Sequence, residues 1–556
     1  MSEFVEIRLG GTFLLNAGIL GFIKVLEHFG LRENSDYFFE GQTLKVPQKF
    51  FEDNDLTEMY VKTMTEKFEP DTRFFQTLNR QNRTEMLNSL QEPTTEEQKE
   101  LKNIYEEFTA MVTKASFKTG YAIISEFDDV EKIDEDLIND FKKEQDPVEK
   151  YRLYSILCDL LSQRKVKEVL IFKELAYSKM EMFFESQSFS LISRMNAKKD
   201  VRKVYEKDFA KPLVESFDKS KKKNKRCIEC REMVYSTRAT SFMLDTTDDI
   251  SRKVSYYWNF NPDALICPLC SFLYTLVPLG FAFLGQDAVF VNNNNSIETL
   301  KSFMTLIESK TDSDETARVR IFKAFTEVKA DVLENRLDNI QVVFKRNKRY
   351  DNSDHFVMNI INKDIVSGII KGKKPLSFLE RKLVKTADGY INVYEEVFQN
   401  IIYNRNQYKL IDKLLRLEFA DGRNINYLKY ILDVQDCFSG GKRMKNDMDI
   451  VNWAFNEGRK MRESLTFDIK SNDEKDVDNH LRSYVYKLLN YVSVNNVNGY
   501  IDTVIRIYEG KSIPSIFKEM RQSDDMFKTI GQSYILGLKY QRSSKPNEEN
   551  AKEATQ

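Results

Sequence analysis

The sequence has little histidine and no recognisable catalytic motif. Only three histidines occur in 556 residues, His28, His355 and His480, and none stands in an HExxH or HxExxH metal-binding pattern. A GxSxG nucleophile motif and a GxxxxGK[ST] phosphate loop are also absent. The carboxylates are abundant, but their spacing does not pair them into an active site. These absences predict a binding or scaffolding protein that is not an enzyme.

Proline and glycine are also scarce, and the net charge is small. Eleven prolines and twenty glycines stand against forty phenylalanines and twenty-six tyrosines, which predicts a folded, mostly helical chain with few linkers. The net charge of −2 neither requires nor excludes a nucleic-acid partner, so any basic binding face has to be local.

One uncharged stretch, Ala264 to Gln286, has the length of a membrane span. It contains two cysteines, Pro268, Pro278 and Gly280, and polar sequence flanks it on both sides. A buried strand and helix is therefore favoured over a membrane helix. The protein is expected to be soluble and cytoplasmic.

Two CxxC motifs, Cys227-Ile228-Glu229-Cys230 and Cys267-Pro268-Leu269-Cys270, are separated by thirty-six residues. Four thiolates are the number that a closed tetrahedral zinc site needs. Disulfides are an alternative, but no signal peptide is recognisable, so reduced thiols are expected. Thioredoxin-like redox chemistry would need one CxxC motif at the start of a helix. Because cysteine fills all four positions, the zinc is expected to be structural and not catalytic.

The residues around the motifs predict an α+β protein that is predominantly helical. Residues 3–9 alternate as an amphipathic strand, and Thr12 can cap an apolar helix that begins at Phe13. Gly18 and Gly21, with Ala17, are expected to let this helix pack closely on a sheet. A hairpin follows at 37–46, helical spacing dominates 50–209 and 376–540, and strands are expected at 288–291, 340–344 and 355–361. Cys158 and Cys437 are isolated and expected to be buried, inert thiols.

These patterns divide the chain into five regions. An N-terminal α/β and helical region is followed by an inserted zinc-binding segment, a mixed helix and hairpin region, a C-terminal helical bundle and a disordered tail. Their predicted bounds are 1–210, 211–296, 297–375, 376–540 and 541–556.

Three polar stretches are candidate nucleic-acid contacts. A lysine run before Cys227 can contact phosphates, although such runs are usually solvated loops. An asparagine run can bond base edges or simply form a turn. A basic connection after 344 suits a nucleic-acid backbone or an exposed hairpin tip. The candidate residues are Lys221, Lys222, Lys223 and Lys225; Asn292, Asn293, Asn294 and Asn295; and Lys345, Arg346, Lys348 and Arg349.

The order of these landmarks resembles the CXXC-CXXC family, the large subunits of type I-B CRISPR surveillance complexes (Cascade). The resemblance rests on the Asn16-to-Phe22 run after an opening strand, the two CxxC motifs, the apolar segment behind them, Val289-Phe290-Val291 and the asparagine run. It covers roughly residues 1 to 300, and the helical C-terminal third fits as well.

The resemblance implies a non-catalytic subunit with several partners. Such large subunits lie near the 5′ handle of the CRISPR RNA, recognise the protospacer-adjacent motif in target double-stranded DNA, help to open the duplex, and recruit a helicase-nuclease. They assemble with backbone and small subunits, and their C-terminal bundle resembles the small subunit, which related systems also make separately. Met444 and Met448 are candidate internal starts. A free-standing zinc-stabilised DNA-binding regulator and a metal-dependent defence nuclease remain alternative functions.

Overall fold

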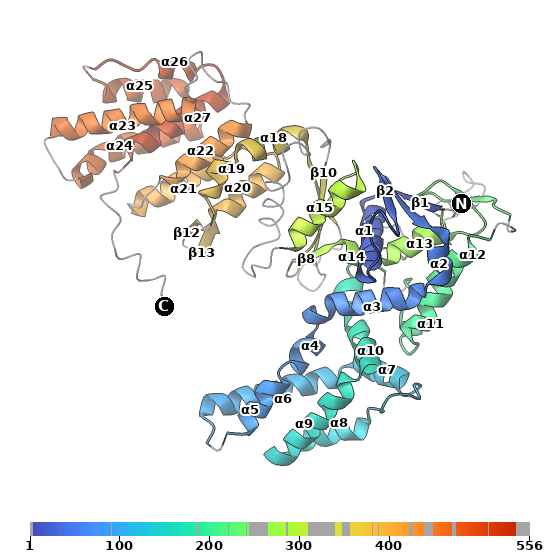
Figure 1. Ribbon diagram of the computed structural model, residues 1–556. Coiled ribbons are helices and arrows are strands. Elements are labelled where there is room, and N and C mark those ends of the chain that lie inside the picture. Colours follow the sequence, from blue (N-terminus) through green and yellow to red (C-terminus); the bar gives the residue numbers. More distant parts are fainter. Residues whose placement is uncertain are drawn as a thin grey trace, which may run out of the picture. The chain divides into compact units, whose positions relative to one another are not determined.

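The computed structural model divides the chain into two compact units (Figure 1), and each is described by itself. Unit 1 comprises Met1–Ser309 and Ile340–Met358, and unit 2 comprises Lys310–Asn339 and Asn359–Gln556. Helices predominate and the sheets are small, which confirms the predicted fold class. The five predicted regions are a finer division and stay a prediction. The structure describes residues 4–90, 92–185, 188–218, 220, 222–240, 242–243, 265–284, 287–309, 340–346, 356–380, 382–386, 389–421, 426–438, 449–469, 474–509 and 511–540.

Unit 1 opens with a small antiparallel sheet in the order β1-β3-β2. Its strands are β1 (Phe4–Arg8), β2 (Phe38–Glu40) and β3 (Thr43–Pro47), and Val5 pairs with Val46. The predicted first strand and hairpin are confirmed. Helix α1 (Phe13–His28) lies between β1 and β2 in the chain and is buried along most of its length.

The glycines of α1 allow it to touch the backbone of two other helices. A Cβ atom on Gly18 would lie 2.3 Å from the Leu273 carbonyl oxygen, and one on Gly21 would lie 2.1 Å from that of Leu276. These carbonyls belong to α13 (Pro268–Thr275) and to the residue before α14 (Val277–Gly280). The predicted close packing is therefore correct, but its partner is a helix pair and not a sheet, because the apolar stretch behind the second CxxC motif folds against α1.

That apolar stretch is buried as predicted, in a short strand, two helices and the start of a second sheet. Among the residues described, no helix has both the length and the apolar character to cross a membrane. The second sheet has the order β11-β10-β9-β8, with strands β8 (Ala282–Leu284), β9 (Asp287–Asn292), β10 (Ile340–Arg346) and β11 (Val357–Ile361). Helix α15 (Ile297–Glu308) follows β9 and is capped by Ser296. The strands predicted in this part of the chain are confirmed.

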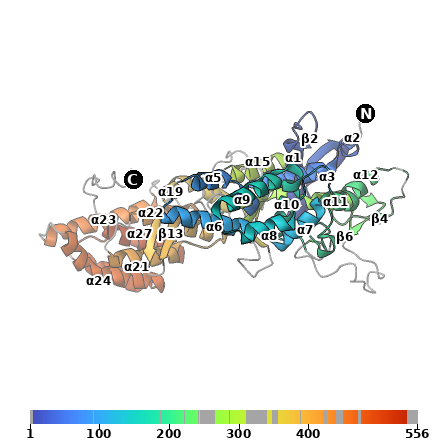
Figure 2. The ribbon, with the colours of Figure 1, turned by 90° about the horizontal axis from the view of Figure 1, so that it is seen from below.

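Several of the other helices of unit 1 begin at a side-chain cap. Asp55, Thr94 and Asp146 each accept first-turn amide hydrogens, and Thr94 forms a full capping box with Glu97. Figure 2 shows α5, α6, α8 and α9 running side by side. The helices are α2 (Gln48–Asp53), α3 (Leu56–Phe68), α4 (Arg73–Leu78), α5 (Gln81–Asn88), α6 (Thr95–Val112), α7 (Ala115–Ile124), α8 (Glu135–Lys143), α9 (Pro147–Ser162), α10 (Arg164–Leu175), α11 (Val201–Tyr205) and α12 (Lys211–Glu215).

The described residues of unit 2 are mostly helical, as predicted, and they include a two-stranded sheet that the sequence interpretation missed. This hairpin consists of β12 (Leu383–Thr386) and β13 (Gly389–Asn392). Close backbone contact joins α23 (Ile450–Ile469) and α27 (Asp524–Leu538), where a Cβ atom on Gly458 would lie 2.2 Å from the Tyr534 carbonyl oxygen. The helices are α18 (Lys363–Lys371), α19 (Lys373–Ser377), α20 (Val393–Ile402), α21 (Tyr408–Asp421), α22 (Tyr427–Phe438), α23 (Ile450–Ile469), α24 (Glu474–Ser493), α25 (Val497–Ile507), α26 (Ile516–Glu519) and α27 (Asp524–Leu538).

Candidate metal centre and its contacts

Two short antiparallel strand pairs and one helix bring the four cysteines together. Strand β4 (Lys225–Arg226) pairs with β5 (Met233–Val234), and the turn between them carries the first CxxC motif. Strand β6 (Arg238–Ala239) pairs with β7 (Leu265–Ile266), which leads into Cys267. Helix α13 begins at Pro268, so Cys270 lies in its first turn. Each motif is therefore held by a different local element.

The first motif forms a tight turn. The Cys227 amide donates to the Glu232 carbonyl at 3.0 Å, and Arg231 adopts a left-handed conformation with φ of 62°. The Ile228 amide donates to the Leu265 carbonyl at 3.0 Å, which joins this turn to β7. The turn is thereby fixed against the strand that delivers the second motif.

The sulfur positions fit a tetrahedral metal site. All four Sγ atoms lie within 4.8 Å of one another, with 3.8 Å between Cys227 and Cys270 and 3.7 Å between Cys230 and Cys267. A tetrahedron with metal–sulfur bonds of about 2.3 Å has edges of about 3.8 Å. A disulfide would need about 2.05 Å between sulfurs. The four cysteines are thus placed to hold a metal ion and are not bonded in pairs.

The thiols also require a cation if they are to be ionised together. Cys227, Cys267 and Cys270 are buried, whereas Cys230 is exposed. Contact with Cys227 and Cys230, together with burial, raises the pKa of Cys267 and of Cys270. Adjacent thiolates repel one another, so a bound cation favours the loss of all four protons. Amide hydrogens assist, because Cys267 N donates to Cys227 Sγ at 3.2 Å and Cys270 N donates to Cys267 Sγ at 3.3 Å.

Glu229, inside the first CxxC motif, links the cysteine cluster to α1. Its carboxylate accepts a hydrogen bond from the Tyr274 hydroxyl at 2.6 Å and another from Thr12 Oγ1 at 3.2 Å. Thr12 stands at the N-cap position of α1, but its side chain does not cap the helix as predicted, because it turns to Glu229 instead. The first turn of α1 contains no acidic residue, so Glu229 supplies the negative charge that favours a helix N-terminus.

Asn16 forms a second link, between α1 and the asparagine run. It is fully buried, and its amide group donates to Oδ1 of Asn292 at 2.8 Å, to Oδ1 of Asn294 at 2.7 Å and to the Gly10 carbonyl at 3.2 Å. The Gly10 amide donates back to Asn16 Oδ1 at 2.8 Å. This network satisfies the polar groups at the point where β1, α1 and the end of β9 meet.

Residues 220–282 match a family model described as CRISPR-associated protein (Cas_CXXC_CXXC). The CXXC-CXXC segment is therefore similar to that of a CRISPR-associated protein. The match contains all four cysteines together with α13 and α14, the helices that pack on α1. It confirms the predicted resemblance to the CXXC-CXXC family, whereas the type I-B large subunit stays a prediction. A comparison of the chain with curated proteins gave no match.

The lysines that precede the first CxxC motif are accessible to a partner. Lys222, Lys223 and Lys225 are exposed, and Lys225 lies in β4, two residues before Cys227. Lys221 lies outside the described residues. The cluster of cysteines therefore has positive side chains beside it, as a phosphate contact would need.

The asparagine run is mainly a structural element. Asn292 is 1% exposed and also donates to Gln341 Oε1 at 3.0 Å, and Asn293 is 2% exposed. Their burial argues against direct base contact by these two side chains. Asn294 is exposed and Asn295 is partly exposed, and the Asn295 amide donates to Asn293 Oδ1 at 2.9 Å, which forms a turn.

The basic connection after β10 is described only at its start. Lys345 is 0% exposed, and its Nζ lies 4.6 Å from the centre of the Phe356 ring, so it does not face solvent. Arg346 ends β10. Lys348 and Arg349 lie outside the described residues.

Two lysines, Lys24 and Lys67, contact the same carboxylate and the same backbone carbonyl, and the carbonyl belongs to a helix that follows the second CxxC motif. Glu308 Oε1 lies 2.6 Å from Lys24 Nζ and 3.4 Å from Lys67 Nζ, and both ammonium groups donate to the Leu279 carbonyl. Burial and the charge of Lys24 lower the pKa of Lys67 to about 7. This carbonyl belongs to α14, so the two lysines hold α1 and α3 against that helix.

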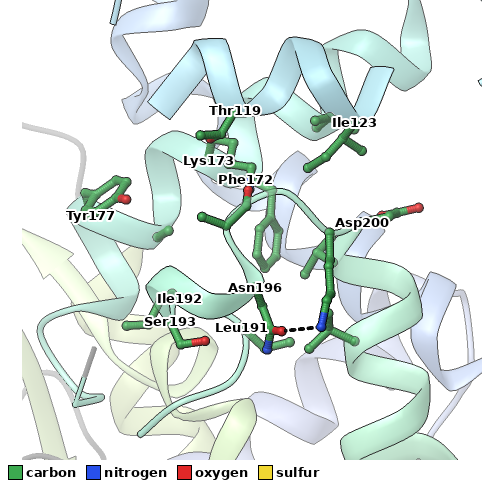
Figure 3. Close-up of a pocket in the computed structure, with 16 residues that line it drawn as sticks. Thr119, Ile123, Phe172, Lys173, Tyr177, Leu191, Ile192, Ser193, Asn196 and Asp200 are labelled. Atoms are coloured by element: carbon green, nitrogen blue, oxygen red, sulfur yellow. Dashed lines mark hydrogen bonds between the residues drawn. The ribbon is translucent and has the colours of Figure 1, made fainter. Parts of the chain in front are cut away.

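A separate cavity in unit 1 is too small for a substrate. It encloses about 30 Å³ between α7, α10 and the segment before α11 (Figure 3), which is room for one or two water molecules. Lys173 borders it and donates to the Ala197 carbonyl at 2.5 Å, and burial lowers the pKa of Lys173 to about 8.

The two isolated cysteines differ in burial. Cys158, as predicted, is fully buried, and burial raises its pKa to about 12. Cys437 was also expected to be buried but is only half-buried.

The sequence interpretation missed the roles of Thr12, Glu229 and Asn16. Asn16 gave a usable signal, since it is a polar residue in the middle of an apolar helical run. Glu229 gave none, because one carboxylate between two cysteines looks like a surface residue until Thr12 and Tyr274 are placed beside it.

Proposed function

We propose that this protein is a non-catalytic large subunit of a type I-B CRISPR RNA-guided surveillance complex (Cascade). In this role it contacts the 5′ handle of the CRISPR RNA, recognises the protospacer-adjacent motif in target double-stranded DNA and helps to recruit the helicase-nuclease, in the cytoplasm. The observation that carries the proposal is the CRISPR-associated family match over residues 220–282, which surround the cysteine cluster.

The metal proposed for the cluster is zinc. Zinc favours tetrahedral four-cysteine sites, and the sulfur separations of 3.7 and 3.8 Å suit its bond length. Four protein ligands leave no position for a water molecule, so the ion would stabilise the segment and not activate a nucleophile.

The exposed lysines beside the cluster are the proposed phosphate contacts. Lys222, Lys223 and Lys225 project next to a segment that the metal and Glu229 hold in place. Phosphate contacts position a protein on nucleic acid without reading its sequence, while guide pairing supplies most of the sequence specificity. Asn294 and Asn295 reach solvent from the neighbouring turn and are the candidates for contact with the duplex motif.

Purification from the native host tests the proposal. The tagged chain is isolated, its co-purifying RNA is sequenced, its partner proteins are identified and its metal content is measured. Discrete repeat-derived RNA, several partner subunits and about one zinc per chain are expected. A chain that carries zinc but neither RNA nor partners would overturn the surveillance role and favour a free-standing DNA-binding regulator. Metal-dependent cleavage of DNA by the purified chain would favour a nuclease.

A further inference from the structure

A second basic region lies in unit 2, away from the cysteines in the sequence. Between residues 371 and 385 the chain has six basic residues and a single acidic one, Glu380. Among the described residues, Lys371, Lys373, Lys374 and Lys385 are exposed. The basic residues of this stretch are Lys371, Lys373, Lys374, Arg381, Lys382 and Lys385.

Aromatic rings accompany these lysines at the corner between α19 and α22. Phe378 follows α19 and stacks on Tyr430 with 4.5 Å between ring centres and 18° between planes, yet it remains 51% exposed. Lys382 Nζ lies 4.4 Å from the centre of the Tyr427 ring, one turn earlier on α22. A ring that is both stacked and half-exposed offers a flat apolar face to a partner.

The β12–β13 hairpin continues this surface. Tyr390 pairs with Lys385 across the two strands, and Tyr390 is 69% exposed. Leu383 is 55% exposed, whereas Val384, on the opposite face, is buried and holds the hairpin to the helices. The Val393 amide donates to the Lys382 carbonyl at 3.0 Å, which fixes the base of the hairpin at the lysine that contacts Tyr427. Figure 1 shows the hairpin at the edge of unit 2 beside α20 and α21.

We propose that this basic–aromatic surface, formed by Lys371, Lys374, Phe378, Lys385 and Tyr390, binds single-stranded nucleic acid. Exposed lysines attract phosphates, and exposed ring faces stack on bases that are unpaired. An acidic protein would use the lysines but would not require flat rings beside them. A duplex would present its phosphates but keep its bases stacked inside. The surface goes beyond the proposed function, because it assigns a nucleic-acid contact to unit 2 that does not depend on the CXXC-CXXC segment.

Fluorescence anisotropy with the full chain tests the surface. The probes are labelled oligo-dT and oligo-U of fifteen nucleotides and a DNA duplex of equal length. Tyr390→Ala is expected to weaken single-strand binding roughly 5- to 150-fold through lost stacking. The triple variant Lys371→Gln/Lys374→Gln/Lys385→Gln is expected to weaken it at least about tenfold and to reduce the salt slope by about 2. Tighter binding of oligo-dT or of oligo-U shows whether the ligand is single-stranded DNA or RNA.

Matched control variants distinguish binding at this surface from a general effect of the positive charge of the protein. Lys413, Lys487 and Lys518 are exposed lysines elsewhere in unit 2, and their triple change to glutamine removes the same charge. Tyr403, 41% exposed at the end of α20, is the control for Tyr390. The control variants are expected to bind as the unaltered chain does. Equal losses in control and test variants, unchanged binding by Tyr390→Ala, or equal affinity for duplex and single strand would each overturn the proposal. Metal and co-purifying RNA are expected to stay unchanged, which separates this test from the test of the proposed function.

Discussion

Asn16 and Asn292 lie 276 positions apart, and the amide of the first donates to the side-chain oxygen of the second at 2.8 Å in a buried site. The bond joins α1 to the end of β9, and the CXXC-CXXC segment lies between these two residues in the chain. The segment is therefore held at both sides, by Asn16 through β9 and by Glu229 through Thr12. Its position therefore depends on contacts with α1 as well as on the cysteine cluster.

Asn16→Ala is expected to lower the free energy of unfolding of unit 1 by about 3 kcal/mol. The change leaves Asn292 Oδ1 without this partner in a buried site and the Gly10 amide without it in a partly buried one, and unsatisfied buried groups cost about 1–3 kcal/mol each. The bond to the exposed Asn294 is lost as well, at a smaller cost. Urea unfolding measures the loss. Asn54→Ala removes a single exposed bond to the Phe50 carbonyl and serves as the control. Equal effects of the two changes would contradict the role of Asn16.

Gly18→Ala is expected to destabilise the protein by more than about 3 kcal/mol, although alanine favours a helix by about 1 kcal/mol. The new methyl group would lie 2.3 Å from the Leu273 carbonyl oxygen, and backbone cannot move aside as a side chain can. Gly11→Ala meets no atom within 4 Å and is the matched control. Thermal unfolding compares the two variants, and a stable Gly18→Ala protein would show that α1 and α13 can separate.

Cys267→Ser is expected to abolish stoichiometric metal binding and to unfold the segment around the cysteines. Structural zinc contributes about 10–16 kcal/mol of apparent binding free energy, which folds the residues that hold it. Metal analysis and hydrogen exchange over 222–240 and 265–284 measure both effects. Cys437→Ser, in unit 2, controls for loss of a thiol. Strong chelators are expected to reproduce the effect of Cys267→Ser on the unaltered protein, and resistance to both treatments would refute a structural metal.

Glu229→Gln is expected to retain the metal and loosen the start of α1. The neutral amide keeps the size of the carboxylate but loses its charge, which weakens the bonds from Thr12 and Tyr274 by about 1 kcal/mol or more. Hydrogen exchange at residues 10–16 is expected to rise while zinc content stays the same. Glu232→Gln changes an exposed carboxylate nearby and is expected to alter neither. Loss of metal from Glu229→Gln would mean that Glu229 supports the cluster itself.

Lys67 is expected to make stability rise with pH above neutrality. Its pKa is about 7 in the folded chain and about 10.4 when unfolded, so between these values the unfolded chain binds more protons. Below pH 7 both states are charged and the contribution is constant. The unaltered protein is expected to gain about 1–2 kcal/mol over Lys67→Met between pH 7 and pH 9, less than full burial would give, because the side chain keeps 27% exposure. Urea unfolding at several pH values tests this, and a flat or falling difference would refute it.

Local patterns in the sequence predicted the local structure well. Alternation in residues 4–8, the apolar run of α1 and the cysteine spacing each depend on neighbours in the chain, and each is found as predicted. The hairpin at 383–392 was missed because both of its strands are only four residues long and one face carries exposed residues.

Contacts between residues distant in sequence explain the remaining differences between the predicted and the observed structure. Thr12 has the residue type of a cap, but Glu229 competes for its hydroxyl group. Asn292 and Asn293 have the composition of a surface turn, yet they are buried because α1 and β10 cover them. Gly18 and Gly21 indicated close packing correctly, but the sequence could not show whether a helix or a sheet approached. Such choices depend on the tertiary fold and not on the local chain.

The separation between α1 and its partners also sets an order of events during synthesis. Helix α13 begins 240 residues after α1 ends (268 − 28), and Asn292 follows Asn16 by 276 residues. At about 5–20 residues per second, the face of α1 that packs on α13 and α14 stays uncovered for about 12–55 s. Chaperones therefore have a defined interval in which to hold α1, and it ends when the second pair of cysteines and the strand that follows them emerge.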